Sequence, residues 1–424
     1  MREILFLAHR IPYPPDKGDK IRSWHLLEGL AARFRVHLGT FVDDPDDWQH
    51  VAKLREVCGE VCVRPLDPRV ARLRSLAGLM TGRALTLDYY RDAKLIEWVR
   101  RLARERPLAG TFAFSSSMAQ YAEGLLLAPG ARRVVDLCDV DSDKWRQYAS
   151  VRAWPMSWVF GREARLLAAA ECRYIDSFDS TLVIAPAEAE ILCRLAPESA
   201  ERIGILPNGV DTSFFDPDQS FPNPFPADSR SIVFTGAMDY HPNVDGVAWF
   251  ADEILPQVRA RVPRAQFWIV GSKPTAEVRS LARREGVTVT GRVADIRPYL
   301  AHASVIVAPL RIARGVQNKV LEGLAMARPL VATPNAVQGI EGIGRNELVV
   351  APAGGEFAAE VVRALELPVP NRVTAARDFV AKRLTWNAQL DVLAALLQAG
   401  HGLAPTRRSV TVGAEPVALP GSQI

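Results

Sequence analysis

The sequence predicts an α/β protein made of two Rossmann-like domains, each with a parallel sheet. Its 424 residues exceed what one ordinary core usually holds, so two domains are expected. Short, β-branched apolar runs alternate with helical spacers in two successive series, which is typical of parallel strands covered on both faces. A segment with four prolines, from Phe215 to Pro226, separates the two series and precludes a regular element there.

Each apolar run is expected to form one strand of a doubly wound sheet. Helices are expected near Lys20–Arg33, between Pro274 and Gly286, at Ala375–Lys382 and at Trp386–Leu397. The expected strands are Ile4–Ala8, Val36–Phe41, Val61–Val63, Phe112–Phe114, Arg133–Leu137, Thr181–Ile184 and Ile203–Leu206, then Ile232–Thr235, Phe267–Val270, Val287–Thr290, Val305–Ala308, Leu330–Ala332 and Leu348–Val350.

The domain limits follow from these runs and from the prolines. We expect a first domain at 1–207, a Pro-rich linker at 208–229 and a second domain at 230–384. A terminal helix at 385–400 is expected to pack back on the first domain. The aperiodic segment 401–424, which contains Pro, Gly, Ser and Arg, is expected to be disordered.

The composition is that of a globular protein in a reducing compartment. Hydrophobic residues make up 48% and charged residues 24%, and no apolar run is long enough to span a membrane. The first apolar run is too short for a signal peptide. The five cysteines lack zinc spacing, so we expect reduced, mostly buried thiols and a cytoplasmic protein.

Positive charge gathers in one segment, Arg64–Arg106, with eleven Lys/Arg against five Asp/Glu. Because leucines accompany this charge, the segment could lie on an anionic membrane surface. The alternative is a solvated helical face over an ordinary core. Nucleic-acid binding is disfavoured because no recognition motif accompanies the charge.

The stretch Arg314–Ala325 carries the clearest functional signal. It reads as a loop and a helix, followed by a buried strand, with Gly315 and a positive charge at the start of the helix. Backbone N–H groups and the helix dipole attract phosphate there, and Lys319 can add a charge. Glu322, three residues later on the same face, can accept hydrogen bonds from two sugar hydroxyls. The alternative is a Lys–Glu pair on an amphipathic surface helix.

The other polar loops also follow predicted strands. In open α/β sheets the ligand lies outside the carboxyl ends of the strands, so two facing domains would enclose an interdomain cleft. The loops concerned are His9–Asp19, Asp136–Asp143, Gly236–Asn243, Gly271–Pro274, Gly291–Asp295 and Pro309–Lys319.

Six motifs occur in order along the chain: Pro12–Arg22, Leu206–Asp211, Phe234–Gly236, Ile269–Gly271, Val289–Asp295 and Lys319–Ala325. Together they resemble the GT-B glycosyltransferases, specifically the family-4 group that uses nucleotide-sugar donors. The resemblance covers nearly the whole chain, from Ile4 to about Leu397. Four segments, His9–Lys20, Val135–Trp145, Ala237–Asn243 and Gly315–Glu322, are similar to those of the sugar transferases that accompany the PEP-CTERM/exosortase system, which narrows the resemblance to that group.

The loops and the resemblance together imply a set of site residues. The family usually carries a glutamate at the position of Arg314, so sugar handling is expected to differ here. The family's N-domain histidine also has no equivalent in Thr111–Ser117, and His9 and His241 are the only histidines in the cleft loops. The expected residues are Lys319, Arg314 and Asp19 for catalysis, Gly18, Gly236, Asn243, Arg292, Asp295, Arg311, Gly315 and Glu322 for the donor, and Arg22, Asp139 and Asp141 for the acceptor.

The resemblance implies a hexosyltransferase that needs neither metal nor cofactor beyond its nucleotide-sugar co-substrate. It implies retention of anomeric configuration, a saccharide or lipid-linked acceptor, and a role in exopolysaccharide synthesis. Peripheral contact with the inner membrane surface is a further expectation. The alternatives are a nucleotide-sugar epimerase and a non-catalytic binding or scaffold protein. An NAD enzyme is disfavoured, because no Gly-x-Gly-x-x-Gly follows the first strand of either series.

Overall fold

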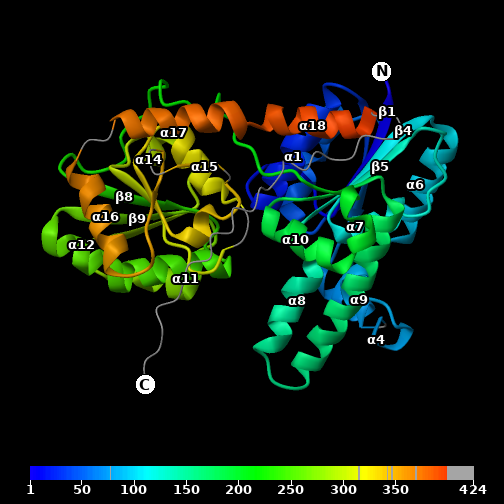
Figure 1. Cartoon of the computed structure of the whole chain (residues 1–424), viewed down its shortest axis with the longest axis horizontal. Helices are drawn as coiled ribbons and strands as arrows, with labels where there is room; N and C mark the ends of the chain where they lie inside the picture. The colour runs from blue at the N-terminus through cyan, green and yellow to red at the C-terminus, as the bar shows by residue number, and fades with distance from the viewer. Residues whose placement is uncertain (77, 314–315, 341, 345–346, 368–369, 399–424) are drawn as a thin grey trace.

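The computed structural model describes residues 1–76, 78–313, 316–340, 342–344, 347–367 and 370–398. It contains two separate sheets, and all their strands are parallel (Figure 1). The first sheet has the order β3-β2-β1-β4-β5-β6-β7. Its strands are β1 (Glu3–Ala8), β2 (Arg35–Val42), β3 (Val61–Pro65), β4 (Leu108–Phe114), β5 (Arg132–Cys138), β6 (Ser180–Val183) and β7 (Ile203–Ile205).

The second sheet repeats the same winding, with the order β10-β9-β8-β11-β12-β13. Every predicted strand is present, and the predicted α/β class with two Rossmann-like domains is confirmed. The strands are β8 (Arg230–Thr235), β9 (Ala265–Val270), β10 (Val287–Gly291), β11 (Val305–Ala308), β12 (Leu330–Ala332) and β13 (Val349–Val350).

Helices cover both faces of the first sheet. Alternate residues of β1 therefore enter two different cores: Leu5 and Leu7 face one, and Ile4 and Phe6 face the other, as the period of a strand requires. The helices of this half are α1 (Gly18–Ala31), α2 (Val51–Val57), α3 (Pro68–Ser75), α4 (Gly78–Thr81), α5 (Leu85–Tyr89), α6 (Ala93–Glu105), α7 (Ser116–Ala122), α8 (Asp141–Ser150), α9 (Met156–Ser177) and α10 (Pro186–Leu195).

The remaining helices alternate with the strands of the second sheet or come after its last strand. One core cluster, from Val210 to Leu384, unites this half. The helices are α11 (His241–Trp249), α12 (Leu255–Arg261), α13 (Ala276–Leu281), α14 (Arg297–Ala301), α15 (Asn318–Ala325), α16 (Gly355–Glu366), α17 (Pro370–Arg383) and α18 (Trp386–Gln398).

The last two helices run from one half of the molecule to the other (Figure 1). α17 packs against α15, whereas α18 packs against α1, β4 and β5. The side chains of Trp386, Leu390 and Leu393 join the core on that face of the first sheet. The chain thus crosses between the halves a second time at Leu384–Trp386.

The two crossings are joined. Val210 N donates to Leu384 O at 2.8 Å, and Val210 forms an isolated parallel bridge with Thr385. A Cβ on Gly209 would lie 2.5 Å from Trp386 N, so this close approach requires glycine. The exact domain and linker limits stay predictions, and the segment 401–424 lies outside the described residues.

Some predicted details differ. The helix expected between Pro274 and Gly286 spans only Ala276–Leu281. It begins after Thr275, because the Thr275 side chain caps its N-terminus. α1 begins at Gly18, so Gly18 and Asp19 lie in its first turn rather than in the preceding loop. All five cysteines lie in the described residues, and none forms a disulfide. The expectation of mostly buried thiols is wrong, because only Cys58 is buried and the other four are half-buried.

Candidate active site

A charged cluster lies where β1 ends and α1 begins. Asp19 is 3.3 Å from His9 Nε2 and accepts a hydrogen bond from Arg10 Nη1 at 2.5 Å. Arg10 also contacts Asp43. Burial opposes the charge on Asp19, but the His9 hydrogen bond and the His9 and Arg10 charges outweigh it and lower the Asp19 pKa. Asp19 is therefore a fixed anion.

The neighbouring Gly18 is the first residue of α1, and a Cβ placed on it would meet no atom within 4 Å. Open space therefore lies beside this predicted donor residue.

A second acidic cluster follows β5. Burial and the nearby Glu188 and Asp141 charges raise the pKa of Asp139 to about 6, although the residue is solvent-accessible. Asp141 begins α8 and accepts a hydrogen bond from Ser116 Oγ at 2.5 Å. The Asp139 carboxylate is therefore close to other acidic side chains and is still accessible to solvent.

The backbone beside these carboxylates is strained. Ser115, after β4, has φ +84°, and Cys138, at the end of β5, has φ +62°. Non-glycine residues in this region cost free energy and often gather at functional sites. The strain supports the assignment of Asp139 and Asp141 to a site.

Arg22 does not fit its predicted acceptor role. It is buried, and each guanidinium nitrogen donates to the protein: Nε to Asp136 at 2.8 Å, Nη1 to Asn208 at 2.9 Å and Nη2 to Leu206 O at 2.7 Å. Through these three hydrogen bonds Arg22 joins α1, β5 and the crossing between the halves at Leu206–Asn208, so its observed role is structural.

The predicted donor residues Gly236 and Asn243 meet the predicted catalytic residue Lys319 in the second half. Lys319 Nζ donates to Asn243 Oδ1 at 3.1 Å, and Asn243 Nδ2 donates to Ala237 O at 2.8 Å. A Cβ on Gly236 would lie 2.7 Å from Asn243 Nδ2 and 3.5 Å from Lys319 Cε. Lys319 also lies 5.0 Å from the centroid of the Phe234 ring. α15 and the loop after β8 thus place Gly236, Asn243 and Lys319 side by side, and we call this group the Lys319 wall.

Burial dominates the ionisation of the α15 pair. It lowers the pKa of Lys319 to about 8, against the attraction of Glu322. It raises the pKa of Glu322 to about 7, against the attraction of Lys319. Neither group makes a hydrogen bond to the other within the described residues. A phosphate beside Lys319 and a diol beside Glu322 would each stabilise the charged form.

The other predicted donor residues have protein partners. Asp295 accepts hydrogen bonds from Arg297, with Nη2 at 2.7 Å, and the Arg297 hydrogen bonds and charge outweigh burial to lower the Asp295 pKa. Arg311 binds Asp245, with Nη2 at 2.5 Å, and its side chain is 43% exposed. Arg314 and Gly315 lie outside the described residues.

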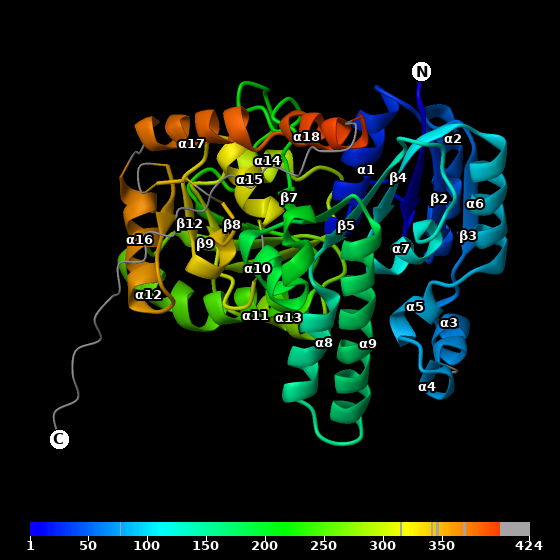
Figure 2. The same cartoon turned by 45° about the vertical axis from the view of Figure 1, so that its right-hand side comes forward.

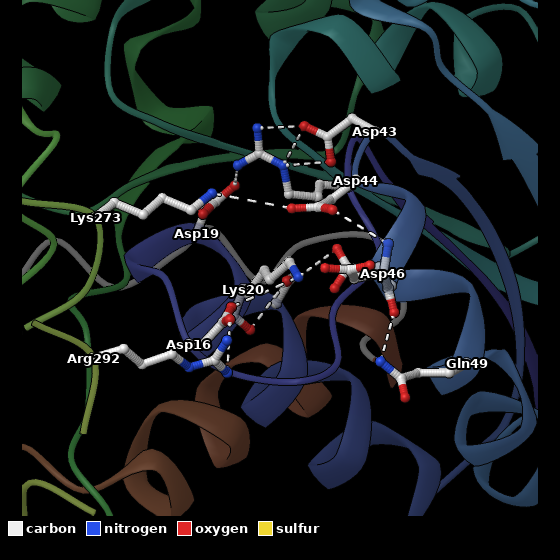
Figure 3. Close-up of polar contacts among 12 residues, drawn as sticks. Asp16, Asp19, Lys20, Asp43, Asp44, Asp46, Gln49, Lys273 and Arg292 are labelled. Carbon is white, nitrogen blue, oxygen red and sulfur yellow. Dashed lines mark hydrogen bonds and ion pairs between the residues drawn. The ribbon is translucent and has the colours of Figure 1, made fainter. Parts of the chain in front are cut away.

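Loops from the two halves approach one another at charged residues. Arg292 lies 3.9 Å from Asp16, and Lys273 lies 4.0 Å from Asp44 (Figure 3). Figure 3 also shows Lys20 between the acidic residues of the first half; its Nζ is 2.7 Å from Asp47. Arg292 is therefore at the boundary between the halves, as the prediction of a cleft residue requires.

One electrostatic interaction and one hydrogen bond also cross this boundary. Tyr240, in the Gly236–Asn243 loop, has its pKa raised by burial and by the charge of Asp139, which Lys144 partly offsets. Asn208 Nδ2 donates to Asn318 Oδ1 at 3.0 Å, at the first residue of α15. The Asp139 cluster and the Lys319 wall thus belong to one interdomain region.

Sequence reasoning missed Arg10, Tyr240, Lys273 and Asn208. Arg10, Tyr240 and Lys273 lie inside loops that the sequence marked as functional, and Asn208 lies in the motif Leu206–Asp211. Lys273 adopts φ +54°, a backbone conformation that no sequence signal indicates. In the part of the chain that is described, no group of His, Cys, Asp or Glu could hold a metal ion, and the metal-independent mechanism stays a prediction.

Residues 229–367 match the model of a family described as glycosyl transferases group 1. No curated protein sequence matches the chain. Several solved structures have the same fold, and all are distant in sequence.

Sucrose-phosphate synthase from Thermosynechococcus elongatus is 17% identical, with a TM-score of 0.67, over 93% of this chain and 98% of that one. WaaG, a glycosyltransferase involved in lipopolysaccharide biosynthesis, is 17% identical, with a TM-score of 0.65, over 94% and 100%. Anabaena HepE, in complex with UDP and glucose, is 14% identical, with a TM-score of 0.63, over 93% and 98%. The fold is therefore GT-B, and the family match over the second half supports a glycosyltransferase.

Proposed function

We propose that the protein transfers a sugar from a nucleotide-sugar donor to a saccharide or lipid-linked saccharide. The wall formed by Gly236, Asn243 and Lys319, with Glu322 one turn away, carries the proposal. Lys319 and the first turn of α15 would hold the diphosphate, and Glu322 would hold the ribose. The group 1 family match covers this same half of the chain, and the HepE structure contains UDP.

The first half would hold the acceptor. Asp139 and Asp141 offer carboxylates to acceptor hydroxyls, and Asp19 would orient the reacting groups from the start of α1. Transfer needs the departing diphosphate stabilised and the acceptor hydroxyl held close. We propose that cations and the helix dipole provide this stabilisation without a metal, and that anomeric configuration is retained, as the resemblance to family 4 implies.

The proposed setting is the cytoplasmic face of a membrane, in exopolysaccharide synthesis of the PEP-CTERM type. The resemblance to the PEP-CTERM sugar transferases supports the pathway, and five cysteines that form no disulfide support a reducing compartment. The basic segment Arg64–Arg106 would contact anionic lipid. Among the described helices, none is both long and apolar enough to cross a bilayer.

Calorimetric titration with UDP, GDP and their sugars would test the donor site. Removal of one charge-assisted hydrogen bond costs about 1.5–3 kcal/mol, so Lys319→Ala and Glu322→Ala should each weaken nucleotide binding by at least about tenfold and keep the wild-type fold. Arg264→Ala is the control, because that side chain is 73% exposed. Wild-type affinity in both site variants would falsify the donor assignment, and product analysis would separate sugar transfer from epimerisation or mere binding.

A further inference from the structure

The tip of the α8–α9 hairpin exposes large apolar side chains. Val151 is 77% exposed, Trp154 79% and Trp158 58%, and Tyr148 and Met156 are each 44% exposed. Scattered apolar residues on a surface are ordinary, but a contiguous group marks an interaction site. These five exposed residues lie within one short stretch, Tyr148–Trp158, at the turn between α8 and α9.

The tip also carries an exposed cation. Arg152 is the only charged residue of Tyr148–Trp158, and it is exposed. Arg146, on α8 next to the tip, is 73% exposed and pairs with Asp143. Tryptophan with flanking arginine is typical of the interface between a bilayer and water, because the indole has an apolar body and a polar N–H.

α3 has a similar surface. Val70, Leu73 and Leu76 are 59%, 72% and 52% exposed, and they alternate with the exposed Arg69, Arg72 and Arg74. Figures 1 and 2 show that the hairpin and the α3–α5 segment project from the same side of the first half.

Buried polar residues of α9 attach this segment to the hairpin. Arg162 Nη2 donates to Gly78 O at 2.6 Å. Glu163 accepts from Leu85 N at 2.7 Å and from Thr86 N at 2.8 Å. Glu163 is fully buried, so these bonds are shielded from water, and breaking them would leave a buried carboxylate unpaired. The two projections therefore form one unit.

We infer that the hairpin tip, Tyr148–Trp158, and α3, Pro68–Ser75, together seat the protein on an anionic bilayer. The inference rests on the proposed function and specifies its acceptor as lipid-linked. α8 connects the tip to Asp141 and has ten residues, which is about 15 Å. An acceptor anchored in the bilayer would thus present its saccharide about one helix length away, beside Asp139 and Asp141.

Vesicle co-sedimentation of the full chain tests this surface without donor or acceptor. The wild type should pellet with phosphatidylglycerol vesicles at low salt. It should not pellet with phosphatidylcholine vesicles, and high salt should abolish its pelleting with phosphatidylglycerol vesicles. A double variant that carries both Trp154→Ser and Trp158→Ser should lose most of this pelleting. Arg152→Ala should weaken binding about fivefold, the expected effect of one basic residue at an anionic surface. The controls are Leu126→Ser and Arg264→Ala, at exposed positions.

UDP binding, measured in parallel, should be unchanged in every tip variant. A tip variant that pellets like the wild type would overturn the inference, as would equal wild-type pelleting with both lipids or none with either. A concentration-dependent dimer that the tip substitutions abolish would show instead that this surface joins two copies of the chain. Vesicle binding without any nucleotide binding would refute the proposed donor site and leave the surface standing.

Discussion

Lys319 and Glu322 differ from an ordinary surface pair, because burial shifts both pKa values toward neutrality. The pKa of Lys319 is about 8 and that of Glu322 about 7. The pKa of each group is thus close to neutral pH. A ligand that favours the charged form of either group therefore changes the protonation of that group. A group in this state is a candidate for function rather than for stability.

Nucleotide-sugar binding should therefore have a maximum between pH 7 and 8. Phosphate binds the protonated amine, so affinity should fall as pH rises above the Lys319 pKa of about 8. Ribose hydroxyls donate to the ionised carboxylate, so affinity should fall as pH drops below the Glu322 pKa of about 7. Titration calorimetry across pH 6–9 with Lys319→Gln should remove the alkaline loss, and Glu322→Gln the acidic loss. A flat profile in the wild type would contradict the prediction.

The sequence predicted which loops meet better than it predicted distant side-chain pairings. Lys319 and Asn243 come from two motifs at strand ends, and the structure brings them together, whereas their ligand-binding roles stay predictions. Arg22 carries a similar signal, but its counter-charge, Asp136, lies 114 residues away. Arg311 likewise binds Asp245, 66 residues away. A single sequence does not reveal such pairings, so buried structural arginines resemble ligand-binding ones.

At the scale of elements, strands were predicted well and helix ends less well. An apolar, β-branched run such as Val305–Ala308 can only be buried, and parallel strands are buried on both faces. Helix ends depend on caps. Thr275 accepts a hydrogen bond from Val278 N and so starts α13 after Pro274, and α1 starts at Gly18 without any side-chain cap.

Arg22 ties three elements together, and its loss should destabilise the first half. Arg22→Ala would leave Asp136, which is fully buried, without its charged partner. Breaking a buried pair in this way costs about 3–5 kcal/mol. Arg22→Lys should cost part of that amount, since an ammonium cannot reach all three partners. Denaturant unfolding measures the effect, with Arg264→Ala, at a side chain that is 73% exposed, as the control. Wild-type stability together with lost transfer would restore the predicted acceptor role.

The whole molecule depends on how its halves meet. The exposed pairs Arg292–Asp16 and Lys273–Asp44 are long and should contribute little. A series of hydrogen bonds between side chains also joins the halves. Asp136 binds Arg22, Arg22 binds Asn208, and Asn208 binds Asn318 at the start of α15. This series of bonds joins the strand that precedes the acceptor carboxylates to the helix that would hold the donor. Only the folded structure reveals it, because it combines four segments of the chain.

Asn208→Ala should therefore loosen the first turn of α15. The substitution removes the hydrogen bond to Asn318, and such a bond contributes about 0.5–1.5 kcal/mol. Backbone amides near Lys319 should exchange faster with deuterium, by roughly two- to tenfold at that free energy. Asn318→Ala deletes the same hydrogen bond but leaves the Arg22–Asn208 bond in place, so it should also speed exchange. The double variant should exchange no faster than Asn208→Ala alone, because the Asn208–Asn318 bond can be lost only once. Arg292→Ala, which deletes only an exposed contact, should leave exchange in α15 unchanged. Additive effects of the two asparagine substitutions would show that the halves are coupled by some other route.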